Sequence, residues 1–528
     1  MKNIYLLVLA ALIASSCGTN QRLIELQNRG IASDYSELHR PRIHFTPPAM
    51  WMNDPNGMVY HDGEYHLFYQ HYPDSTIWGP MHWGHAVSED LINWEHLPIA
   101  LYPDERGMIF SGSAVIDHQN SSRLGIANMP PMVAIFTYHD AEGEKAGRVD
   151  YQTQGIAYSL NDGRTWEKYL DNPVLENPGI KDFRDPKVMW YPEEKKWVMS
   201  LAVKDRISFY SSRNLLEWEH DSDFGEGLGA QGGVWECPDL FPLQIEGTDE
   251  TKWVLLVSIN PGGPNKGSAT QYFVGDYDGH TFTPDADWPL SEEGIWIDYG
   301  RDNYAGVTWN NVPANGNRRI FMGWMSNWDY ANVVPTEAWR SAMTLPRTLS
   351  LERTDKGLRL ASAPVRELKK LYLNTKTLPA QPLTDSLSIN EAFSTNAIVF
   401  DLSLDLEGSP ENSDFYLELS NNLEQKLLVG YDSQRQQYYI DRSQAGNHDF
   451  SDDFGDIQYG PRMISDPNFS LRLIVDVASV ELFADGGKTS MTSIFFPDEH
   501  FSTLKLYGPK GNMNIKKGEF SELKAMWQ

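Results

Sequence analysis

Short apolar runs, bounded by Gly, Asn, Asp and Pro, follow one another along most of the chain, and helical periodicity is scarce. This pattern predicts an all-β protein. Five of the runs resemble one another, and their first residues are separated by 67, 65, 56 and 66 positions. The runs are YHLFYQHY from Tyr65, MVAIFTYH from Met132, WVMSLAV from Trp197, WVLLVSI from Trp253 and RIFMGWMS from Arg319. A repeat of about 60 residues with four strands in each unit predicts a five-bladed β-propeller over residues 38–350.

The pattern changes beyond residue 350. Residues 351–385 contain the basic stretch RTDKGLRLASAPVRELKKLY and are predicted to be a connector. Residues 386–528 contain runs of alternating apolar and polar residues, such as AIVFDLSLDL and LRLIVDVASVELFADGG, separated by short polar turns. Alternation of this kind is typical of strands with one buried face, so this part is predicted to form a β-sandwich.

The N-terminus has the features of an export signal. Residues 1–17 place one Lys before an apolar run that ends in small residues and Cys17, and the run is too short to span a membrane. Small residues directly before a Cys resemble the signal of a bacterial lipoprotein, in which the thiol of Cys17 carries lipid. A plain secretory signal is the alternative. With acyl chains on Cys17 the exported protein would be membrane-anchored, and residues 18–37 would form a polar tether.

Composition and residue spacing argue against several kinds of function. The chain has 44 Lys and Arg against 72 Asp and Glu, a net charge of −28, which disfavours binding to nucleic acid or to an anionic membrane surface. Cys237 is the only cysteine besides Cys17, and neither zinc-ligand spacing nor a phosphate-binding loop is present, so no metal or cofactor is expected. The 17 Trp suit either stacking on sugar rings or an aromatic-rich β core. No feature indicates a protein partner.

Three acidic residues occupy equivalent places in the repeat. Asp54 in WMNDPNG, Asp185 in FRDP and Glu236 in WECPDLF each precede a Pro by one or two positions. Each also lies just ahead of a repeated run, on the strand expected to be innermost in its blade. A single such acid could be a turn cap or one half of an ion pair. Three at equivalent positions are predicted to meet in a pocket on the propeller axis.

Carboxylates grouped in this way suit glycoside hydrolysis. That reaction needs one carboxylate at the anomeric carbon and one protonated carboxyl that donates to the leaving oxygen. Glu236 lies between Trp235 and Cys237, and apolar neighbours favour the protonated form that a proton donor requires. Pro55 and an Asn56-Gly57 turn are expected to hold Asp54 rigidly for attack. Arg184 is expected to keep Asp185 ionised, because an adjacent cation favours a carboxylate.

The boxes WMNDPNG, FRDP and WECPDLF, in this order, resemble the signature boxes of glycoside hydrolase family 32, the β-fructosidases. The resemblance extends from about Pro41 to the end of the chain and implies a five-bladed propeller followed by a β-sandwich. It implies that Asp54 is the nucleophile, Asp185 the transition-state stabiliser and Glu236 the acid/base. The substrate-binding residues that it implies are Trp51, Met52, Asn53, Gln70, Trp78, Phe110, Ser111, Arg184, Asp298, Tyr299 and Trp324.

The segments NPGGPNKGSATQYFVGDYDG and MGWMSNWDYA look like those of levanases and inulinases more than those of invertases. The resemblance therefore implies a retaining, exo-acting enzyme that releases fructose from levan or inulin. The alternatives are an endo-acting levanase, a fructosyltransferase and a catalytically silent fructan-binding lipoprotein. The sequence leaves the choice between β-2,6 and β-2,1 linkages open.

Overall fold

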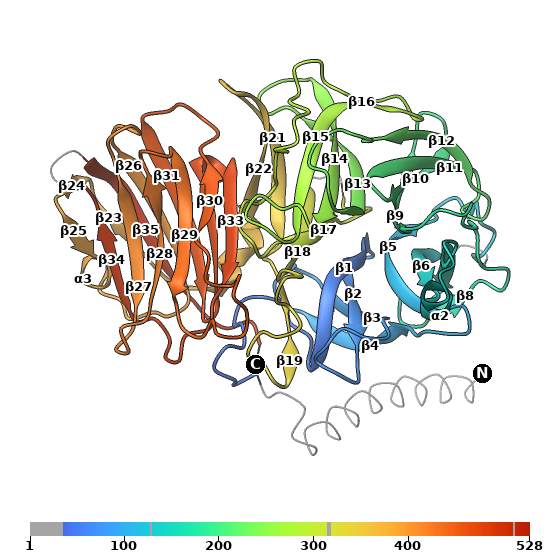
Figure 1. Ribbon diagram of the computed structural model, residues 1–528, viewed down its shortest axis with the longest axis horizontal. Helices are drawn as coiled ribbons and strands as arrows, with labels where there is room; N and C mark the ends of the chain where they lie inside the picture. The colour runs from blue at the N-terminus through green and yellow to red at the C-terminus, as the bar shows by residue number, and fades with distance from the viewer. Residues whose placement is uncertain (1–34, 127–128, 314–317, 510–512, 528) are drawn as a thin grey trace.

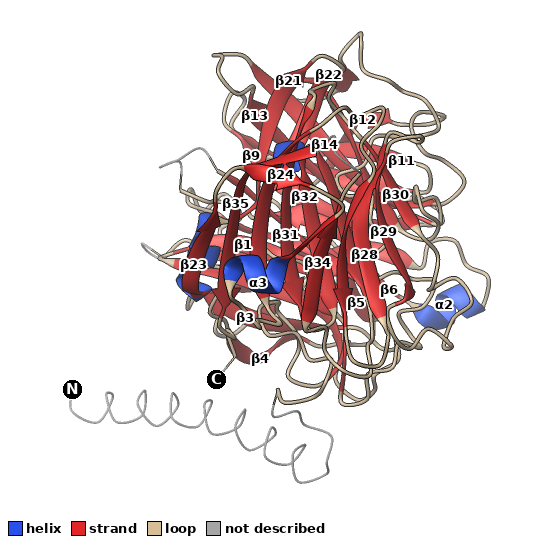
Figure 2. Cartoon of the chain, turned by 90° about the vertical axis from the view of Figure 1, so that its left-hand side faces the viewer, coloured by secondary structure: helices blue, strands red, loops and turns tan. Residues whose placement is uncertain are grey.

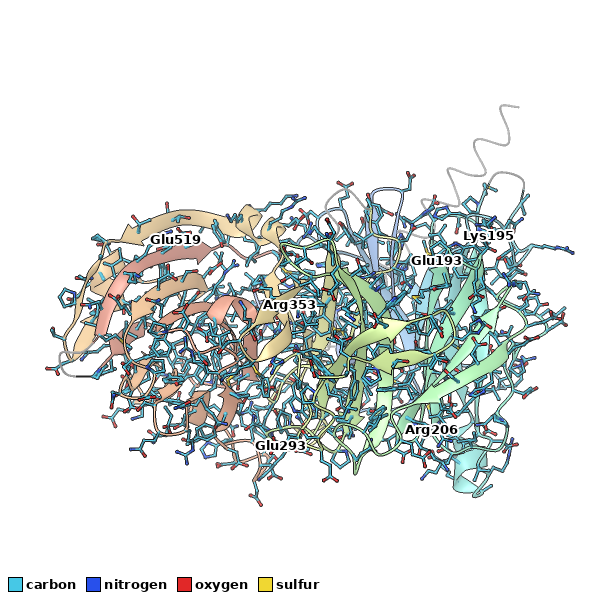
Figure 3. The ribbon with its side chains drawn as sticks, turned by 90° about the horizontal axis from the view of Figure 1, so that it is seen from above. Glu193, Lys195, Arg206, Glu293, Arg353 and Glu519 are labelled. Carbon is cyan, nitrogen blue, oxygen red and sulfur yellow. The ribbon has the colours of Figure 1, made fainter. Side chains whose placement is uncertain are left out.

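The computed structural model describes residues 35–126, 129–313, 318–509 and 513–527. These residues form two β-domains that lie side by side, the first coloured blue to yellow and the second orange to red (Figures 1 and 3). The prediction of an all-β protein with a propeller followed by a sandwich is confirmed. The predicted signal peptide with Cys17, and most of the predicted tether, lie outside the described residues. Tyr35, near the end of that tether, stacks on Trp527 with ring centroids 4.8 Å apart.

Five sheets make up the first domain in the described part of the chain. The first holds β1 (Met50–His61), β2 (Glu64–Tyr72), β3 (His82–Ser88) and β4 (Glu95–Leu101). The second holds β5 (Met108–Ile116), β6 (Met132–His139), β7 (Gln152–Ser159) and β8 (Glu167–Lys168), with the short helix α2 (Ala141–Lys145) between β6 and β7. The third holds β9 (Phe183–Tyr191), β10 (Lys196–Val203), β11 (Arg206–Ser212) and β12 (Glu219–Phe224). The fourth holds β13 (Val234–Gln244), β14 (Thr251–Asn260), β15 (Ala269–Tyr277) and β16 (Phe282–Pro284).

The fifth sheet completes a ring. It contains β17 (Tyr304–Thr308), β18 (Arg319–Met325), β20 (Ala342–Met343), β21 (Arg347–Thr354) and β22 (Gly357–Pro364). The first strand of each sheet contacts the first strand of the next, and β17 returns to contact β1. The ring is also joined by β19 (Trp339–Arg340), which leaves the fifth-sheet segment and pairs in parallel with β1. The five innermost strands therefore surround one axis.

The predicted domain boundary at residue 350 is wrong. Strands β21 and β22 form a hairpin across residues 347–364 and are the outer strands of the fifth sheet. The predicted connector also contains the 3-10 helix η1 (Arg366–Leu371), β23 (Tyr372–Leu378) and β24 (Gln381–Leu383), and both strands already pair within the sandwich. Basic residues suggested a linker, but β22 contains one basic residue, Arg359, which is itself buried between the core residues Leu358 and Leu360. The boundary therefore lies just after residue 364.

The second domain is a sandwich of two sheets, which stand side by side in Figure 2 with α3 (Ile389–Phe393) in front. One sheet contains β23, β24, β26 (Phe400–Glu407), β31 (Asn468–Asp476), β32 (Ser479–Ala484), β33 (Thr489–Ile494) and β35 (Met513–Leu523). The other contains β25 (Ser386–Ser388), β27 (Phe415–Ser420), β28 (Lys426–Asp432), β29 (Gln437–Gln444), β30 (Gln458–Pro461) and β34 (Thr503–Tyr507). The 3-10 helix η2 (Asp485–Gly487) lies between β32 and β33. Alternate residues such as Leu402, Leu417 and Leu473 fill the space between the sheets.

A buried charge network joins the two domains. Arg347 of β21 donates to Asp298 at 2.8 Å and to Glu481 of β32 at 2.5 Å. His44 contacts Glu481 and Asp476, each at 2.8 Å. These side chains are almost completely excluded from solvent, and an uncompensated charge there would cost several kcal/mol. The network, called the interface cluster below, fixes how the sandwich sits on the propeller. In the described ranges no helix is long and apolar enough to cross a membrane.

Candidate active site

The three predicted acids lie on three innermost strands, Asp54 on β1, Asp185 on β9 and Glu236 on β13. At each acid the register of the strand shifts against its neighbour, between Met52 and Pro55 in β1, between Arg184 and Lys187 in β9, and between Glu236 and Asp239 in β13. A Pro lies inside or at the end of each irregularity. Because Pro cannot donate to a strand ladder, it is tolerated where the ladder is already broken, and a bulge re-aims the neighbouring side chain.

The expected Asn56-Gly57 turn is absent from the structure. Strand β1 continues through both residues to His61, and a second register shift falls between Asn56 and Val59. Gly57 has φ +54°, and a Cβ there would come within 2.5 Å of the Phe68 ring. The glycine is therefore needed for a bulge in a strand. Asp54 is held by the strand itself, inside the first register shift and just ahead of the second.

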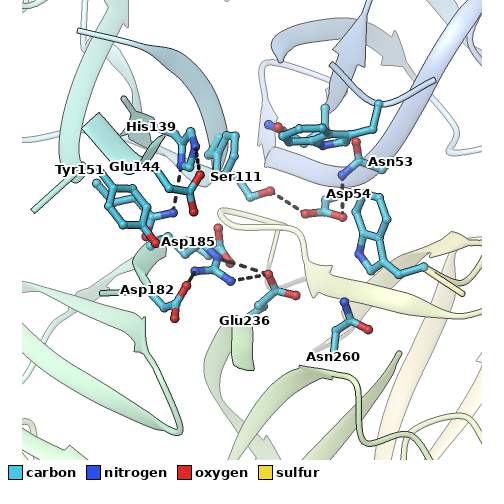
Figure 4. A pocket seen from close by; sticks show the side chains of 16 residues that line it. Asn53, Asp54, Ser111, His139, Glu144, Tyr151, Asp182, Asp185, Glu236 and Asn260 are labelled. Atoms are coloured by element: carbon cyan, nitrogen blue, oxygen red, sulfur yellow. Dashed lines mark hydrogen bonds and ion pairs between the residues drawn. The ribbon is translucent and has the colours of Figure 1, made fainter. Parts of the chain in front are cut away.

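The acids line one pocket of about 280 Å³ on the propeller axis (Figure 4). The lining residues are Asn53, Asp54, Gln70, Trp78, Phe110, Ser111, His139, Glu144, Tyr151, Gln152, Asp182, Arg184, Asp185, Glu236, Asn260 and Trp328. Among the described residues no group of three or more His, Cys, Asp or Glu is arranged to hold a metal ion. Arg184 is the only Lys or Arg side chain among the lining residues, against five acids. The pocket is therefore strongly acidic.

Asp54 is oriented by two neutral donors. The Ser111 hydroxyl donates to Oδ2 at 2.7 Å, and the Asn53 amide donates to Oδ1 at 3.0 Å. Asn53 is itself held by the Trp51 indole, which donates to its Oδ1 at 2.7 Å. Burial and the nearby Glu236 carboxylate raise the pKa of Asp54 to about 6, although the two hydrogen bonds oppose the rise. At neutral pH Asp54 is a carboxylate held in one orientation.

Asp185 lies beside the same cavity. Its Oδ2 accepts from the Cys237 backbone N–H at 3.1 Å. The buried Cys237 thiol lies between two carboxylates, 3.7 Å from Asp185 Oδ2 and 3.8 Å from Asp54 Oδ2. Burial raises the pKa of Asp185 to about 7, with Arg184 lowering it and the charges of Glu236 and Asp54 raising it further. The pocket thus holds carboxylates that disfavour one another's ionisation.

Arg184 lowers the pKa of Asp185 as expected, but burial outweighs this effect, and the hydrogen bonds of Arg184 go to other acids. Its guanidinium donates to Glu236 Oε1 at 2.8 and 3.2 Å and to Asp182 Oδ1 at 2.8 Å, whereas Asp185 Oδ2 is 3.9 Å from Nε. Arg184 and Asp185 both face β13, where Arg184 donates to Glu236 and Asp185 accepts from the Cys237 N–H. Trp235, expected to be an apolar neighbour of the Glu236 carboxyl, is buried, and its indole donates to Ala230 O. Glu236 instead contacts Arg184 and the Tyr304 hydroxyl.

Comparison with known proteins identifies the family. A model of the glycosyl hydrolases family 32 N-terminal domain matches residues 44–364, and the model of that family's C-terminal domain matches residues 367–525. The chain belongs to glycoside hydrolase family 32. The two matched ranges meet directly after the fifth sheet, which agrees with the domain boundary seen in the structure.

Individual relatives cover nearly the whole chain. A levanase from Bacillus subtilis is 46% identical over 499 residues, which are 94% of this chain and 72% of the relative. An extracellular exo-inulinase from Aspergillus niger is 38% identical over 527 residues, covering 94% of this chain and 96% of the relative. The crystal structure of exo-inulinase from Aspergillus awamori superposes with a TM-score of 0.84 at 36% identity, covering 94% and 100% of the two chains. A β-fructofuranosidase from Schwanniomyces occidentalis, complexed with fructosyl-erythritol, gives 0.83 at 32% identity, covering 93% and 99%.

The structure separates the other predicted residues of this family 32 site into two groups. The residues that line the pocket are Asn53, Gln70, Trp78, Phe110, Ser111 and Arg184. The residues that do not are Trp51, Met52, Trp324, Asp298 and Tyr299. Trp51 and Met52 are fully buried in a core cluster, and Trp51 reaches the pocket through Asn53, to which its indole donates, and through Trp328, on which it stacks at 5.9 Å. Trp324 is also buried, and it packs at 4.9 Å on Trp328, which faces the pocket in its place.

Asp298 and Tyr299 lie between the domains. Asp298 accepts from Arg347 and from the Thr492 backbone N–H, each at 2.8 Å, and Tyr299 N–H donates to Ser490 O at 2.7 Å. Asn303 donates to Asp298 Oδ2 at 3.2 Å. The segment that contains Asp298 comes just before β17 and is covered by the sandwich. Asp298 therefore belongs to the interface cluster and does not line the pocket where a sugar would bind.

Several pocket residues were not predicted. They are His139, Glu144, Tyr151, Gln152, Asp182, Asn260 and Trp328. Some carried a signal that could have been used, because Asp182 directly precedes the FRDP box and Trp328 ends the stretch GWMSNW. His139, Glu144 and Gln152 carried none, since a hairpin connection between two strands looks the same whether it faces a pocket or solvent.

Proposed function

We propose that this family 32 protein hydrolyses β-fructofuranosidic bonds of fructans, levan or inulin, from the chain end and releases fructose. The observation that carries the proposal is that Asp54, Asp185 and Glu236, from three separate innermost strands, line one pocket. The relatives named levanase and exo-inulinase, each matching 94% of the chain, support the same substrate class.

The first chemical step is assigned to Asp54 and Glu236. The Asp54 carboxylate attacks the anomeric carbon of the terminal fructosyl unit while the bond to the next sugar breaks. Glu236, in its protonated form, gives its proton to the leaving oxygen. The products are a fructosyl ester on Asp54 and a fructan shortened by one unit. Ser111 and Asn53 support this step because they hold the attacking carboxylate in a single orientation.

The second step restores the enzyme. Glu236, now a carboxylate, takes a proton from a water molecule whose oxygen attacks the same carbon, and the ester bond to Asp54 breaks. Two inversions give net retention of configuration. Asp185, held by the Cys237 N–H, forms no bond to the sugar but stabilises the positive charge that develops in both transition states.

Exo action is supported by the closed floor of the pocket. Lys187 lies two residues beyond Asp185 on β9, and Asp239 lies three residues beyond Glu236 on β13. The two form an ion pair at 3.3 Å, and Lys187 also donates to Thr308 O. Asn310 crosses the axis and donates to Ala114 O and Val188 O at 2.8 and 3.0 Å. All these groups are buried, so the axis is filled below the acids. A blind pocket accepts the end of a polymer, whereas an internal bond needs an open cleft.

Parallel digestion of levan and inulin, with chromatography of early samples, tests this function. Free fructose as the first product supports exo-hydrolysis, and a ladder of oligosaccharides would show endo action. Growth of longer oligosaccharides at high substrate concentration would indicate a fructosyltransferase. Release of no product from either polymer would leave a binding protein and would overturn the proposal.

Export and membrane anchoring through lipid on Cys17 belong to the same proposal. The support is the sequence of residues 1–17 and the relatives named extracellular. Replacement of Cys17 by Ser should move the protein from the membrane fraction to the soluble fraction and abolish labelling by a radioactive fatty acid. Unchanged fractionation would refute the anchor and leave the hydrolase proposal untouched.

A further inference from the structure

One wall of the pocket is built from the β6–α2–β7 connection. His139 ends β6, Glu144 belongs to α2, Gln152 begins β7, and all three line the pocket. Figure 4 shows His139 and Glu144 on the side of the pocket opposite Asn53 and Asp54. The reaction proposed above uses none of these three side chains.

The position of Glu144 is well defined. Its Oε2 lies 3.2 Å from His139 Nε2, and His139 Nδ1 lies 3.2 Å from the Gln152 side-chain amide. Because that amide nitrogen can only donate, Nδ1 accepts and Nε2 carries the proton given to Glu144. The His139 ring stacks on Phe110, with centroids 4.2 Å apart and planes at 7°. Burial lowers the pKa of His139, with Glu144 opposing the change, so the ring is neutral at neutral pH.

The connection itself is also braced. Asp140 accepts from the Gly143 N–H at 2.9 Å and from Arg148 at 3.1 Å, which fixes the first turn of α2. In the described part of the chain neither Lys nor Arg forms an ion pair with Glu144, and its second oxygen, Oε1, has no protein partner. A fixed carboxylate with one unpaired oxygen faces the cavity.

Depth in the pocket places Glu144 relative to the substrate. The exposed fraction of the side chain is 6% for Asp185, 19% for Glu236 and 47% for Glu144. Asp185 and Glu236 therefore mark the floor, and Glu144 lies at the mouth. In a pocket closed at its floor, the unit that is cut off occupies the floor and the next unit of the chain lies at the mouth.

We infer that Glu144 binds hydroxyl groups of the sugar on the leaving side of the scissile bond and determines which fructans are accepted, with His139 as its positioning residue. The inference rests on the proposed function. A carboxylate accepts hydrogen bonds from two hydroxyls, and such charge-assisted bonds discriminate strongly against a leaving group that has none.

Comparison of two substrates tests the role of Glu144. One is a fructo-oligosaccharide and the other is 4-nitrophenyl β-fructofuranoside, whose leaving group carries no sugar hydroxyls. In Glu144→Ala, kcat/KM for the oligosaccharide should fall about tenfold to a hundredfold more than kcat/KM for the aryl fructoside, mainly through KM. Equal losses on both substrates, or no loss on the oligosaccharide, would overturn the inference. A wild-type protein that cleaves neither substrate would instead refute the proposed function.

Glu142 provides a matched control on the same helix. Its side chain is exposed and does not line the pocket, and among the described residues its one ion pair is with Lys145 at 2.8 Å. Glu142→Ala should change the ratio of the two kcat/KM values by less than about twofold. A shift as large as that of Glu144→Ala would mean that general charge, rather than contact, sets the preference and would overturn the inference.

A double variant tests how His139 acts. If His139 works by holding Glu144, His139→Gln should lower the oligosaccharide-to-aryl ratio, and the Glu144→Ala, His139→Gln double variant should lower it no further than Glu144→Ala alone. Additive losses would show that His139 contacts the substrate independently and would remove its positioning role.

Discussion

The pocket and the interface cluster both bury several acids, but they balance the charge in opposite ways. In the interface cluster Glu481 contacts Arg347 and His44 and also accepts from the Leu345 N–H. Although burial opposes the change, these partners lower the pKa of Glu481 to about 2. In the pocket, no cation among the described residues contacts Asp54, and burial raises its pKa to about 6.

This difference distinguishes a structural acid from a functional one. An acid whose cation and amide partners are all in place is permanently ionised and holds two domains together. An acid that shares its surroundings with other carboxylates keeps a pKa near neutrality, where it can react or exchange a proton. The number of cations within contact distance, rather than burial, separates Glu481 from Asp54.

Asp54→Asn, which has the largest expected effect, tests the acids of the pocket. An amide cannot form the fructosyl ester, so kcat should fall about ten-thousand-fold. The melting temperature should stay the same or rise, since the substitution removes a buried charge from the pocket. Steady-state kinetics on inulin or levan and thermal unfolding measure the two effects. Retention of more than about a tenth of wild-type activity would remove Asp54 as the nucleophile.

Arg347→Met tests the acids of the interface cluster. It leaves Glu481 and Asp298 buried without their shared cation, so the free energy of unfolding should fall by about 3–5 kcal/mol. Activity of the remaining folded protein at low temperature should stay within about twofold. Arg353→Met is the control, because the Arg353–Glu250 pair is exposed and its loss should cost less than about 0.5 kcal/mol. Denaturant titration that shows equal losses for both variants would contradict the distinction.

Asp185→Asn should lower kcat about a hundredfold to a thousandfold with little change in KM, because its charge matters mainly in the transition state. Stability should be unchanged or higher, since the variant removes one of several like charges from the pocket. A result dominated by a rise in KM would reassign Asp185 to binding a sugar hydroxyl.

His44 should make the interface cluster sensitive to alkali. Burial alone would lower its pKa, but the bonds to Asp476 and Glu481 raise it to about 9. The stabilisation is complete below the unfolded value of about 6.5 and is lost as pH rises towards 9, a change of about 3 kcal/mol. Unfolding free energies measured at several pH values should show this decline in wild type, and His44→Gln should flatten it. A parallel decline in the variant would assign the effect to other groups.

The smallest expected effect is a shift in the pH profile of activity. Asp54 must be ionised to attack and Asp185 must be ionised to stabilise the transition state, so kcat/KM should begin to fall below about pH 7 and fall more steeply below about 6. Ser111→Ala removes a hydrogen bond that lowers the pKa of Asp54, so this acidic limb should move to higher pH. A limb that stays in place, or moves to lower pH, would show that Ser111 does not stabilise the Asp54 carboxylate.

Much of the fold could be predicted from the sequence, because strand patterns are local. Alternating and apolar runs marked most strands, and the similar runs from Tyr65 to Arg319 indicated the repeat. The end of the propeller was misplaced because the basic residues Arg353, Lys356 and Arg359 look like those of a linker, although they belong to the β21–β22 hairpin, and charge alone does not show whether a segment pairs. The register shifts next to Pro55, Pro186 and Pro238 also lay beyond local prediction, although each Pro pointed to an irregular place.

What the sequence by itself determined is the all-β class, the order of the two domains and the three acids on inner strands. Each of these follows from periodicity or from a residue and its immediate neighbours. Only the tertiary structure decided that Arg184 pairs with Glu236, that Asp298 joins the domains and that Glu144 faces the pocket. The first two contacts join residues 52 and 194 positions apart. Glu144 reaches the pocket only because the ring of sheets closes around one axis, and no local pattern records which residues that closure brings together.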